Sequence, residues 1–121
     1  MSYFNERMRA VRVALSGVFQ AFKKETHLKL HLIISLIVVN MGFLLHISKT
    51  DWLFLLLAIA LVISLEMINS VIEKLCDIIK PEQDPKIKYI KDVAAGAVLI
   101  ACVFAMIVGI LVFLPYLKSI W

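Results

Sequence analysis

The sequence has little charge for its length. Of 121 residues, 18% are charged and 62% are hydrophobic, and the mean hydropathy is +0.93. A soluble globule of this size cannot bury so large an apolar share. The composition therefore excludes a soluble domain and indicates an all-α membrane protein, and no nucleic-acid partner is expected from the modest net charge of +4.

Glycine is also scarce, and the motifs that depend on it are missing. The four glycines form neither GxxxxGK[ST] nor GxGxxG, so the phosphate loops of P-loop enzymes and of protein kinases are absent. The two cysteines, Cys76 and Cys102, lie in or beside apolar helical runs and have no CxxC partner. Neither a disulfide nor a cysteine-bound metal is indicated, and we expect both thiols to be free and buried.

Residues 3–24 have the pattern of an amphipathic helix. Apolar side chains recur every three or four positions, at Phe4, Met8, Val11, Leu15, Val18 and Phe22. We expect this helix to lie on the membrane surface, where its cations meet anionic headgroups; packing of the apolar face on protein is the alternative. Because the apolar residues are spaced rather than consecutive, no cleavable signal peptide is expected.

Three later segments are long and apolar enough to cross a membrane as helices, which takes roughly 20 residues. They are residues 28–47, 53–72 and 93–117. A short turn at residues 48–51 joins the first two as an antiparallel hairpin, and a longer loop at residues 80–91, with Pro81 and Pro85, leads to the third. The sequence therefore predicts a single domain over residues 1–121, with an amphipathic surface helix followed by three transmembrane helices.

The basic residues set the orientation of these helices. Eleven of the thirteen Lys and Arg residues lie before the first span, at its start, or around the loop at residues 80–91, which leaves Lys49 and Lys118 for the other side. Lysine and arginine are enriched in the cytoplasmic segments of membrane proteins. The amino terminus and the second loop are therefore expected in the cytoplasm, with the carboxyl terminus outside.

Polar residues interrupt the apolar pattern at the end of the second span. In the stretch SLEMINSVIEKLCDIIKP, Glu66, Glu73 and Asp77 fall on one helical face, called the acidic face below. Asn69 and Ser70 lie on its flanks. Solvated charges at a helix end would explain Glu73 and Asp77. Glu66, however, lies roughly 20 Å along the span, near the inner boundary of the hydrocarbon, where an ionisable group costs at least ~2.5 kcal/mol and indicates a functional site or a buried partner.

The other two spans carry polar residues at the same depth. Glu25 precedes the first span, and Lys91 and Asp92 precede the third. Carboxylates that converge beside a lysine suit Mg²⁺ and a polyphosphate, because hard oxygen ligands hold the metal and the ammonium offsets phosphate charge. The arrangement predicts phosphoryl transfer at the membrane surface.

Two motifs resemble those of a known family. The stretch EMINSVIEKLCD, with the pattern E-x-x-N-S-x-x-E-x-x-x-D, and the stretch KDVAAGAV resemble the prokaryotic diacylglycerol kinases, small integral-membrane lipid kinases that include the undecaprenol kinases. The resemblance covers nearly the whole chain. It implies a homotrimer in the bacterial plasma membrane that transfers the γ-phosphate of ATP, with Mg²⁺, to the hydroxyl of a membrane lipid.

The resemblance also implies roles for residues at the acidic face. Glu66 would be the general base, supported by Asn69, and would contact the lipid together with Ser70. Glu25 and Glu73 would hold the magnesium ion. The polar residues would then form an active site on the cytoplasmic side of the membrane.

A second set of residues is expected to bind the nucleotide. By resemblance, Lys91 and Asp92 would contact its phosphate and sugar, and the two magnesium-binding glutamates and Asp77 would complete the site. Because the chain has no glycine-rich phosphate loop, Lys91 and the amino-terminal basic residues, among them Arg7 and Arg12, are expected to neutralise the phosphates.

The identity of the lipid depends on one further stretch. ETHLKLH, which contains His27 and His31, is closer to the E-R-N-F-R-I-H type of stretch in undecaprenol kinases than to the diacylglycerol-specific branch, which tends to have a carboxylate where His31 stands. We therefore assign His31 to the lipid site, with undecaprenol slightly preferred and diacylglycerol as the alternative. Metal binding by the two histidines is disfavoured because no third ligand is spaced with them.

The third span carries a ridge of small residues. They recur every four positions and are Ala97, Ala101, Ala105 and Gly109. Such a ridge lets a second helix approach closely. The sequence leaves open whether that helix belongs to the same chain or to a neighbouring one.

A non-enzymatic membrane adaptor or ion-path subunit is the alternative from another class. An ion path needs polar groups through the full thickness of the membrane. The stretch from Trp52 to Leu65 offers only Ser64, and the third span offers little beyond Cys102. Polar groups confined to the cytoplasmic half favour chemistry at the surface instead.

Overall fold

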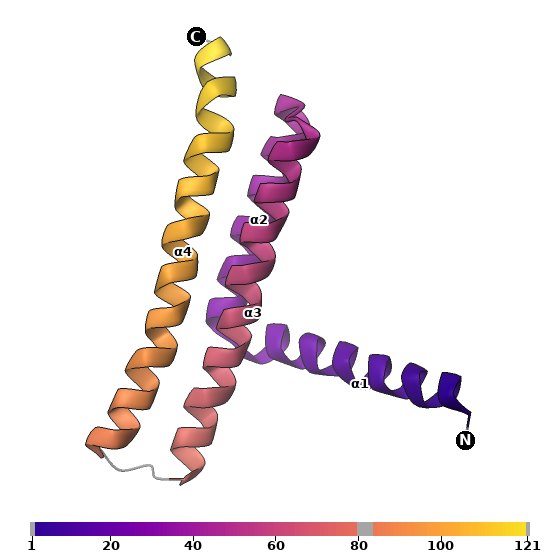
Figure 1. The fold of residues 1–121 in the computed structure, drawn as a ribbon, viewed down its shortest axis with the longest axis vertical. Coiled ribbons are helices and arrows are strands. Elements are labelled where there is room, and N and C mark those ends of the chain that lie inside the picture. The colour runs from indigo at the N-terminus through magenta and orange to yellow at the C-terminus, as the bar shows by residue number, and fades with distance from the viewer. Residues whose placement is uncertain (1, 80–83, 121) are drawn as a thin grey trace.

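The structure, a computed structural model, describes residues 2–79 and 84–120. Within these ranges the chain forms four helices and no strand: α1 (Tyr3–Lys24), α2 (Thr26–Leu45), α3 (Lys49–Ile79) and α4 (Pro85–Ile120). The helices α2, α3 and α4 form an elongated bundle, and α1 leaves that bundle at a steep angle (Figure 1). The predicted all-α membrane fold is confirmed.

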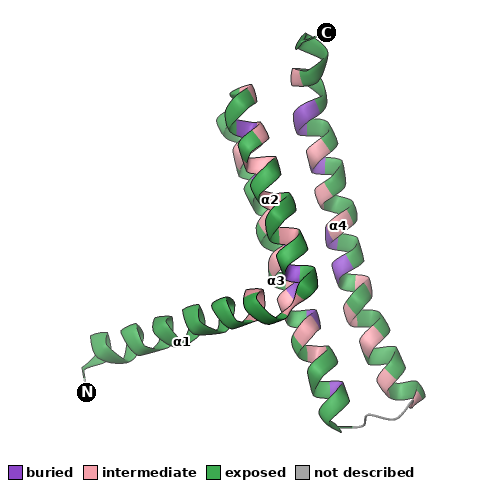
Figure 2. Cartoon of the chain, turned by 180° about the vertical axis from the view of Figure 1, so that it is seen from behind, coloured by how far each residue is buried: buried purple, intermediate pink, exposed green. Residues whose placement is uncertain are grey.

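Helix α1 has no packed core of its own. It begins after Ser2, whose Oγ accepts the backbone N–H of Asn5 at 3.2 Å, and it ends at Glu25, where the backbone becomes extended. Every residue of its first five turns is exposed, as the green ribbon in Figure 2 shows. An amphipathic helix with an exposed apolar face and flanking cations has the features of a helix that lies on a membrane surface.

The three bundle helices are each long and apolar enough to cross a membrane. Their outward faces carry large apolar side chains that are exposed to the surroundings, and the buried residues lie on the faces turned toward neighbouring helices (Figure 2). In water such a surface would be strongly unfavourable, whereas the hydrocarbon core of a bilayer matches it.

The turn between α2 and α3 lies earlier than the predicted residues 48–51. His46 adopts a left-handed conformation with φ 53° and ends α2, so the first span stops before residue 47. Ser48 then caps α3, because its Oγ accepts the backbone N–H of Asp51 at 3.1 Å. Residues 49–51 therefore belong to the helix rather than to the turn.

The predicted loop at residues 80–91 is also mostly helical. Pro85 is the first residue of α4, a position at which proline is favoured because its missing N–H would have no helical partner. The Asp84 carboxylate accepts the N–H of Lys86 at 2.8 Å at the start of this helix, and residues 86–91 are helical. Lys80 and Pro81 lie outside the described residues. At the other end, Pro115 lies inside α4 and does not end it.

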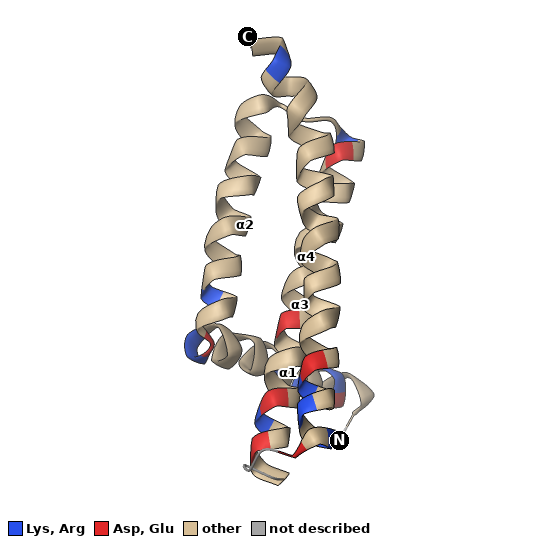
Figure 3. Cartoon of the chain, turned by 90° about the vertical axis from the view of Figure 1, so that its left-hand side faces the viewer, with Lys and Arg blue, Asp and Glu red and all other residues tan. Residues whose placement is uncertain are grey.

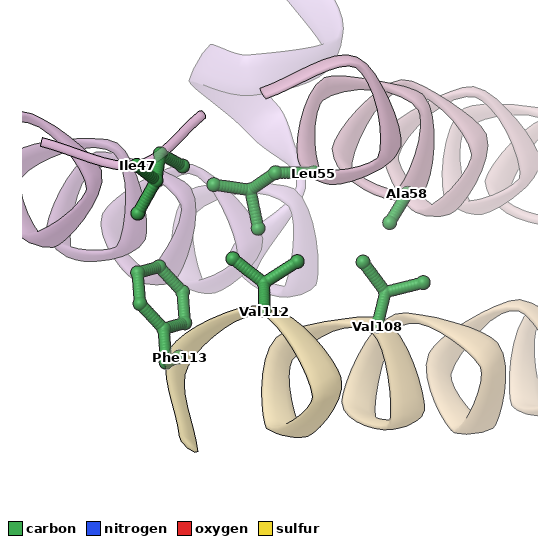
Figure 4. Packing of buried hydrophobic residues seen from close by; sticks show 6 residues of the cluster. All are labelled: Ile47, Leu55, Ala58, Val108, Val112 and Phe113. Atoms are coloured by element: carbon green, nitrogen blue, oxygen red, sulfur yellow. The ribbon is translucent and has the colours of Figure 1, made fainter. Parts of the chain in front are cut away.

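The core lies toward the end of the bundle where α2 turns into α3. Its buried members, drawn in Figure 4, are Ile47, Leu55, Ala58, Val108, Val112 and Phe113. Tyr116 of α4 closes this end, since its hydroxyl donates to Asp51 Oδ2 at 2.8 Å and accepts the N–H of Ser48 at 3.0 Å. The carboxyl-terminal part of α4 is thereby fixed to the α2–α3 turn.

The small-residue ridge of α4 is used within the chain at two of its positions. Ala101 is 1% exposed, and Ala105 packs against the buried core cluster. Helix α4 has its most extensive contacts with α3. The ridge therefore explains close packing of α3 and α4 inside one chain.

Candidate active site

Charged side chains gather at one end of the bundle. Figure 3 shows Lys, Arg, Asp and Glu concentrated where the α1–α2 junction, the carboxyl-terminal half of α3 and the start of α4 meet, with few charges at the opposite end. Long helices that cross an apolar layer keep their charges at the ends, because ionisable groups are costly inside hydrocarbon. Polar chemistry is therefore expected at this end of the bundle.

Glu66 is the deepest acidic residue on α3 and is 6% exposed. Its Oε2 lies 3.8 Å from Nε2 of His31 on α2, a separation within ion-pair range when the imidazole is protonated. The sequence predicted both residues for the lipid site but not their contact. The structure thus pairs the proposed base with a histidine on the neighbouring helix.

Asn69 lies one turn beyond Glu66 and is also buried. Its Nδ2 donates to Oε1 of Glu73 at 3.3 Å, so the amide contacts the proposed metal ligand and makes no hydrogen bond to Glu66 among the described residues. Its Oδ1 is buried and accepts no hydrogen bond from them. A buried acceptor without a donor is costly, so this atom is available to a bound hydroxyl or cation.

Glu25 reaches α3 from the α1–α2 junction. Its Oε1 lies 3.8 Å from Nζ of Lys74, and both residues line a groove between α1 and α3 that also contains Ser70. The groove has a volume of about 320 Å³. The sequence predicted Glu25 and Ser70 as site residues, and the structure brings both to this groove. Lys74 was not predicted as a site residue, and the sequence counted it only among the basic residues that set the orientation.

One ion pair connects the carboxyl-terminal half of α3 with α4, and a second lies within α4. Lys91 Nζ donates to Asp77 Oδ1 at 2.7 Å, and Lys88 Nζ donates to Asp92 Oδ2 at 2.6 Å. Both residues predicted to contact the nucleotide on α4 are therefore already paired with an opposite charge. Lys88, Asp92 and Asp77 are largely accessible to solvent and Lys91 is 37% exposed, so a phosphate can exchange with the present partners.

Arg7 and Arg12 lie away from the acidic face in this chain. Both are exposed on the amino-terminal half of α1, which points away from the bundle (Figure 1). The Arg7 guanidinium donates to the hydroxyl of Tyr3 at 3.0 Å and lies 5.1 Å from the centre of its ring. Neither arginine contacts an acidic-face residue among those that the structure describes.

The donors at this end fit a magnesium ion in part. Among the described residues, no group of three or more His, Cys, Asp or Glu could hold a metal by itself. Magnesium in kinase sites is commonly held by one or two carboxylates together with substrate phosphates. Glu25, Glu73 and the unpartnered Oδ1 of Asn69 are hard oxygen donors of the appropriate kind.

An apolar cleft runs between α2, α3 and α4 toward the core. It measures about 370 Å³, and its lining includes Ile34, Val38, Leu55, Val62, Ala105 and Met106. His31 also lines the cleft, on the side where it contacts Glu66. A hydrocarbon chain in this cleft would place a polar head beside the buried carboxylate.

The fold and this arrangement define a helical membrane protein with a carboxylate-rich, cation-bearing site at one end. The sequence model of the family described as prokaryotic diacylglycerol kinase matches residues 12–113 of the chain. The chain belongs to this family, and it is therefore a bacterial membrane protein and a lipid kinase, a phosphotransferase with an alcohol acceptor.

Relatives named for two different lipids are similar to the chain. An undecaprenol kinase from Bacillus subtilis is 36% identical over 101 residues, which cover 84% of this chain and 82% of that protein. A diacylglycerol kinase from Synechocystis is 34% identical over 110 residues, which cover 90% of this chain and 63% of that protein. A diacylglycerol kinase from Haemophilus influenzae is 27% identical over 107 residues, which cover 88% of this chain and 91% of that protein. These similarities support a lipid kinase and not the alternative of a non-enzymatic membrane subunit.

Proposed function

We propose that the chain transfers the γ-phosphate of ATP to the hydroxyl of a membrane lipid, with Glu66 as the general base. The supporting observation is the burial of Glu66 beside His31, which also lines the apolar cleft. The lipid chain occupies the cleft, and its hydroxyl lies at Glu66 within reach of Ser70 and the amide oxygen of Asn69.

The reaction at this place needs a proton acceptor and a positioned phosphate. As the lipid oxygen attacks the γ-phosphorus, the Glu66 carboxylate takes the hydroxyl proton, a new O–P bond forms, and the bond to the bridging oxygen of ADP breaks. Lys91 binds phosphate after exchanging its bond with Asp77, and Asp92 binds the sugar. Asn69 holds the Glu73 carboxylate in place through its side-chain amide.

Magnesium is the divalent ion that we assign to this site. Glu25 and Glu73 would hold it in the presence of ATP, and Asp77 would lie at the edge of the nucleotide site. When bound, the ion neutralises charge that develops on the transferring phosphoryl group.

The role of Glu66 is tested by Glu66→Gln, which removes the proton acceptor without a change in size. The expected loss in kcat is at least about 100-fold, the smallest effect usually attributed to general-base catalysis. ATP binding should be retained. Glu6→Gln, an exposed position on α1, is the control and should leave kcat unchanged. Retention of more than about a tenth of wild-type kcat by Glu66→Gln refutes the assignment.

For the lipid, we propose undecaprenol in preference to diacylglycerol. The proposal rests on His31 in ETHLKLH and on the likeness to the undecaprenol kinase of Bacillus subtilis. Purified protein with labelled ATP should phosphorylate undecaprenol with the higher kcat/KM in the same bilayer. A reversed ranking would assign the chain to the diacylglycerol branch, with the same chemistry.

We also propose that the chain acts as a homotrimer with its active site in the cytoplasm. Arg7 and Arg12 are exposed on the half of α1 that points away from the bundle, which suits contact with the nucleotide of a neighbour. The mass of the detergent-solubilised complex tests the trimer. Labelling of single cysteines introduced near residues 6 and 118, from either side of sealed vesicles, tests the orientation.

A further inference from the structure

Lys74 is a charged residue at the site that the reaction described above does not use. Its side chain is 64% exposed and its ammonium lies 3.8 Å from the Glu25 carboxylate, which is 29% exposed. Lys74 directly follows Glu73, the second proposed metal ligand, in α3. Among the described residues, it is the one cation that forms an ion pair with Glu25.

The two proposed metal ligands have different partners in this structure. Glu73 accepts a hydrogen bond from Asn69, whereas Glu25 is directed to Lys74. An ammonium beside a carboxylate weakens the binding of a divalent cation to it, because the two positive charges repel each other. Binding of a metal by Glu25 together with Glu73 therefore competes electrostatically with the Lys74 ion pair.

We propose that Lys74 is a positioning residue that competes with the metal for Glu25. In the metal-free protein the ammonium holds the Glu25 carboxylate on the α3 side of the groove, and metal binding displaces it. The exposed, four-carbon side chain can move away into water at little cost. This inference rests on the proposed role of Glu25 as a metal ligand.

Mn²⁺ binding without nucleotide tests the inference directly. The free Mn²⁺ signal in electron paramagnetic resonance gives a Kd for wild type, Lys74→Met and the control Lys24→Met. Lys24 lines the same groove but makes no ion pair with Glu25 among the described residues. Loss of a partly exposed ion pair should tighten Mn²⁺ binding roughly two- to fivefold in Lys74→Met. Lys24→Met should change the Kd by less than half as much.

Other outcomes separate this inference from the proposed function. An unchanged or weaker Kd in Lys74→Met, or no binding by either protein, overturns the inference; a purely structural ion pair would lower thermal stability and leave the Kd unchanged. Lys74→Gln repeats the test if the methionine variant does not fold. If Glu25→Gln weakens Mn²⁺ binding while Lys74→Met has no effect, only the role of Lys74 fails. If Glu25→Gln has no effect, the proposed metal site itself fails.

Discussion

Replacement of Gly42 by alanine should destabilise the bundle, because this position has no room for a methyl group. A Cβ built on Gly42 would lie 2.7 Å from Cη2 and 2.9 Å from Cζ2 of Trp52, and 3.2 Å from Cδ1 of Ile47. Carbon atoms do not approach this closely, so the indole ring or α2 must shift. The ring is packed against Phe43, with centroids 4.8 Å apart, which limits its movement. Overpacking of this kind costs about 1–3 kcal/mol.

The matched control is Gly96→Ala in α4, where an added Cβ meets nothing within 4 Å. Both variants exchange glycine for alanine inside a helix and gain up to about 1 kcal/mol of helix propensity. The difference between the two free energies of unfolding therefore isolates the overpacking of Gly42. Unfolding by sodium dodecyl sulfate in mixed micelles, followed by circular dichroism, measures both. Equal stabilities of the two variants would contradict the packing described for the α2–α3 turn.

Two further predictions concern the metal and the opposite end of the bundle. Glu73→Gln should raise the magnesium concentration at half-maximal rate severalfold, and Asn69→Ala should raise it less; superimposable magnesium titrations of wild type and Glu73→Gln would show that Glu73 is not a ligand. Tyr116→Phe removes two hydrogen bonds to the α2–α3 turn and should lower the free energy of unfolding by about 1–3 kcal/mol. The control Tyr89→Phe, at an exposed position, should leave the free energy of unfolding unchanged. Equal stabilities of the two tyrosine variants would exclude a role for these bonds.

The order and type of the helices could be predicted from the sequence because their signals are local. The spacing of apolar residues defined the surface helix at residues 3–24, where the structure has Tyr3–Lys24. Long apolar runs defined the three spans. The helix starts were less well placed, because they depend on capping by Ser48 and on Asp84 next to Pro85, short signals that the apolar pattern does not contain.

The contacts within the site could be predicted only along a single helix. The spacing of Glu66, Asn69 and Glu73 placed them together on α3, and the Asn69–Glu73 hydrogen bond is of this local kind. The contact of His31 with Glu66 joins α2 to α3, and that of Lys74 with Glu25 joins α3 to the α1–α2 junction. They depend on how far one helix is shifted along another, which is fixed by packing of the whole bundle and not by periodicity.

The continuity of α3 fixes the distance of Glu66 from the start of that helix. Glu66 lies seventeen residues from the start of α3 at Lys49, or roughly 26 Å along an unbroken helix, compared with a hydrocarbon core of about 30 Å. A rigid helix cannot adjust this distance by bending a loop. Thinner membranes expose the carboxylate to water, and thicker ones bury it below the lipid hydroxyls. If Glu66 is the general base, as proposed, turnover should pass through a maximum as the acyl chains of the host lipid are lengthened.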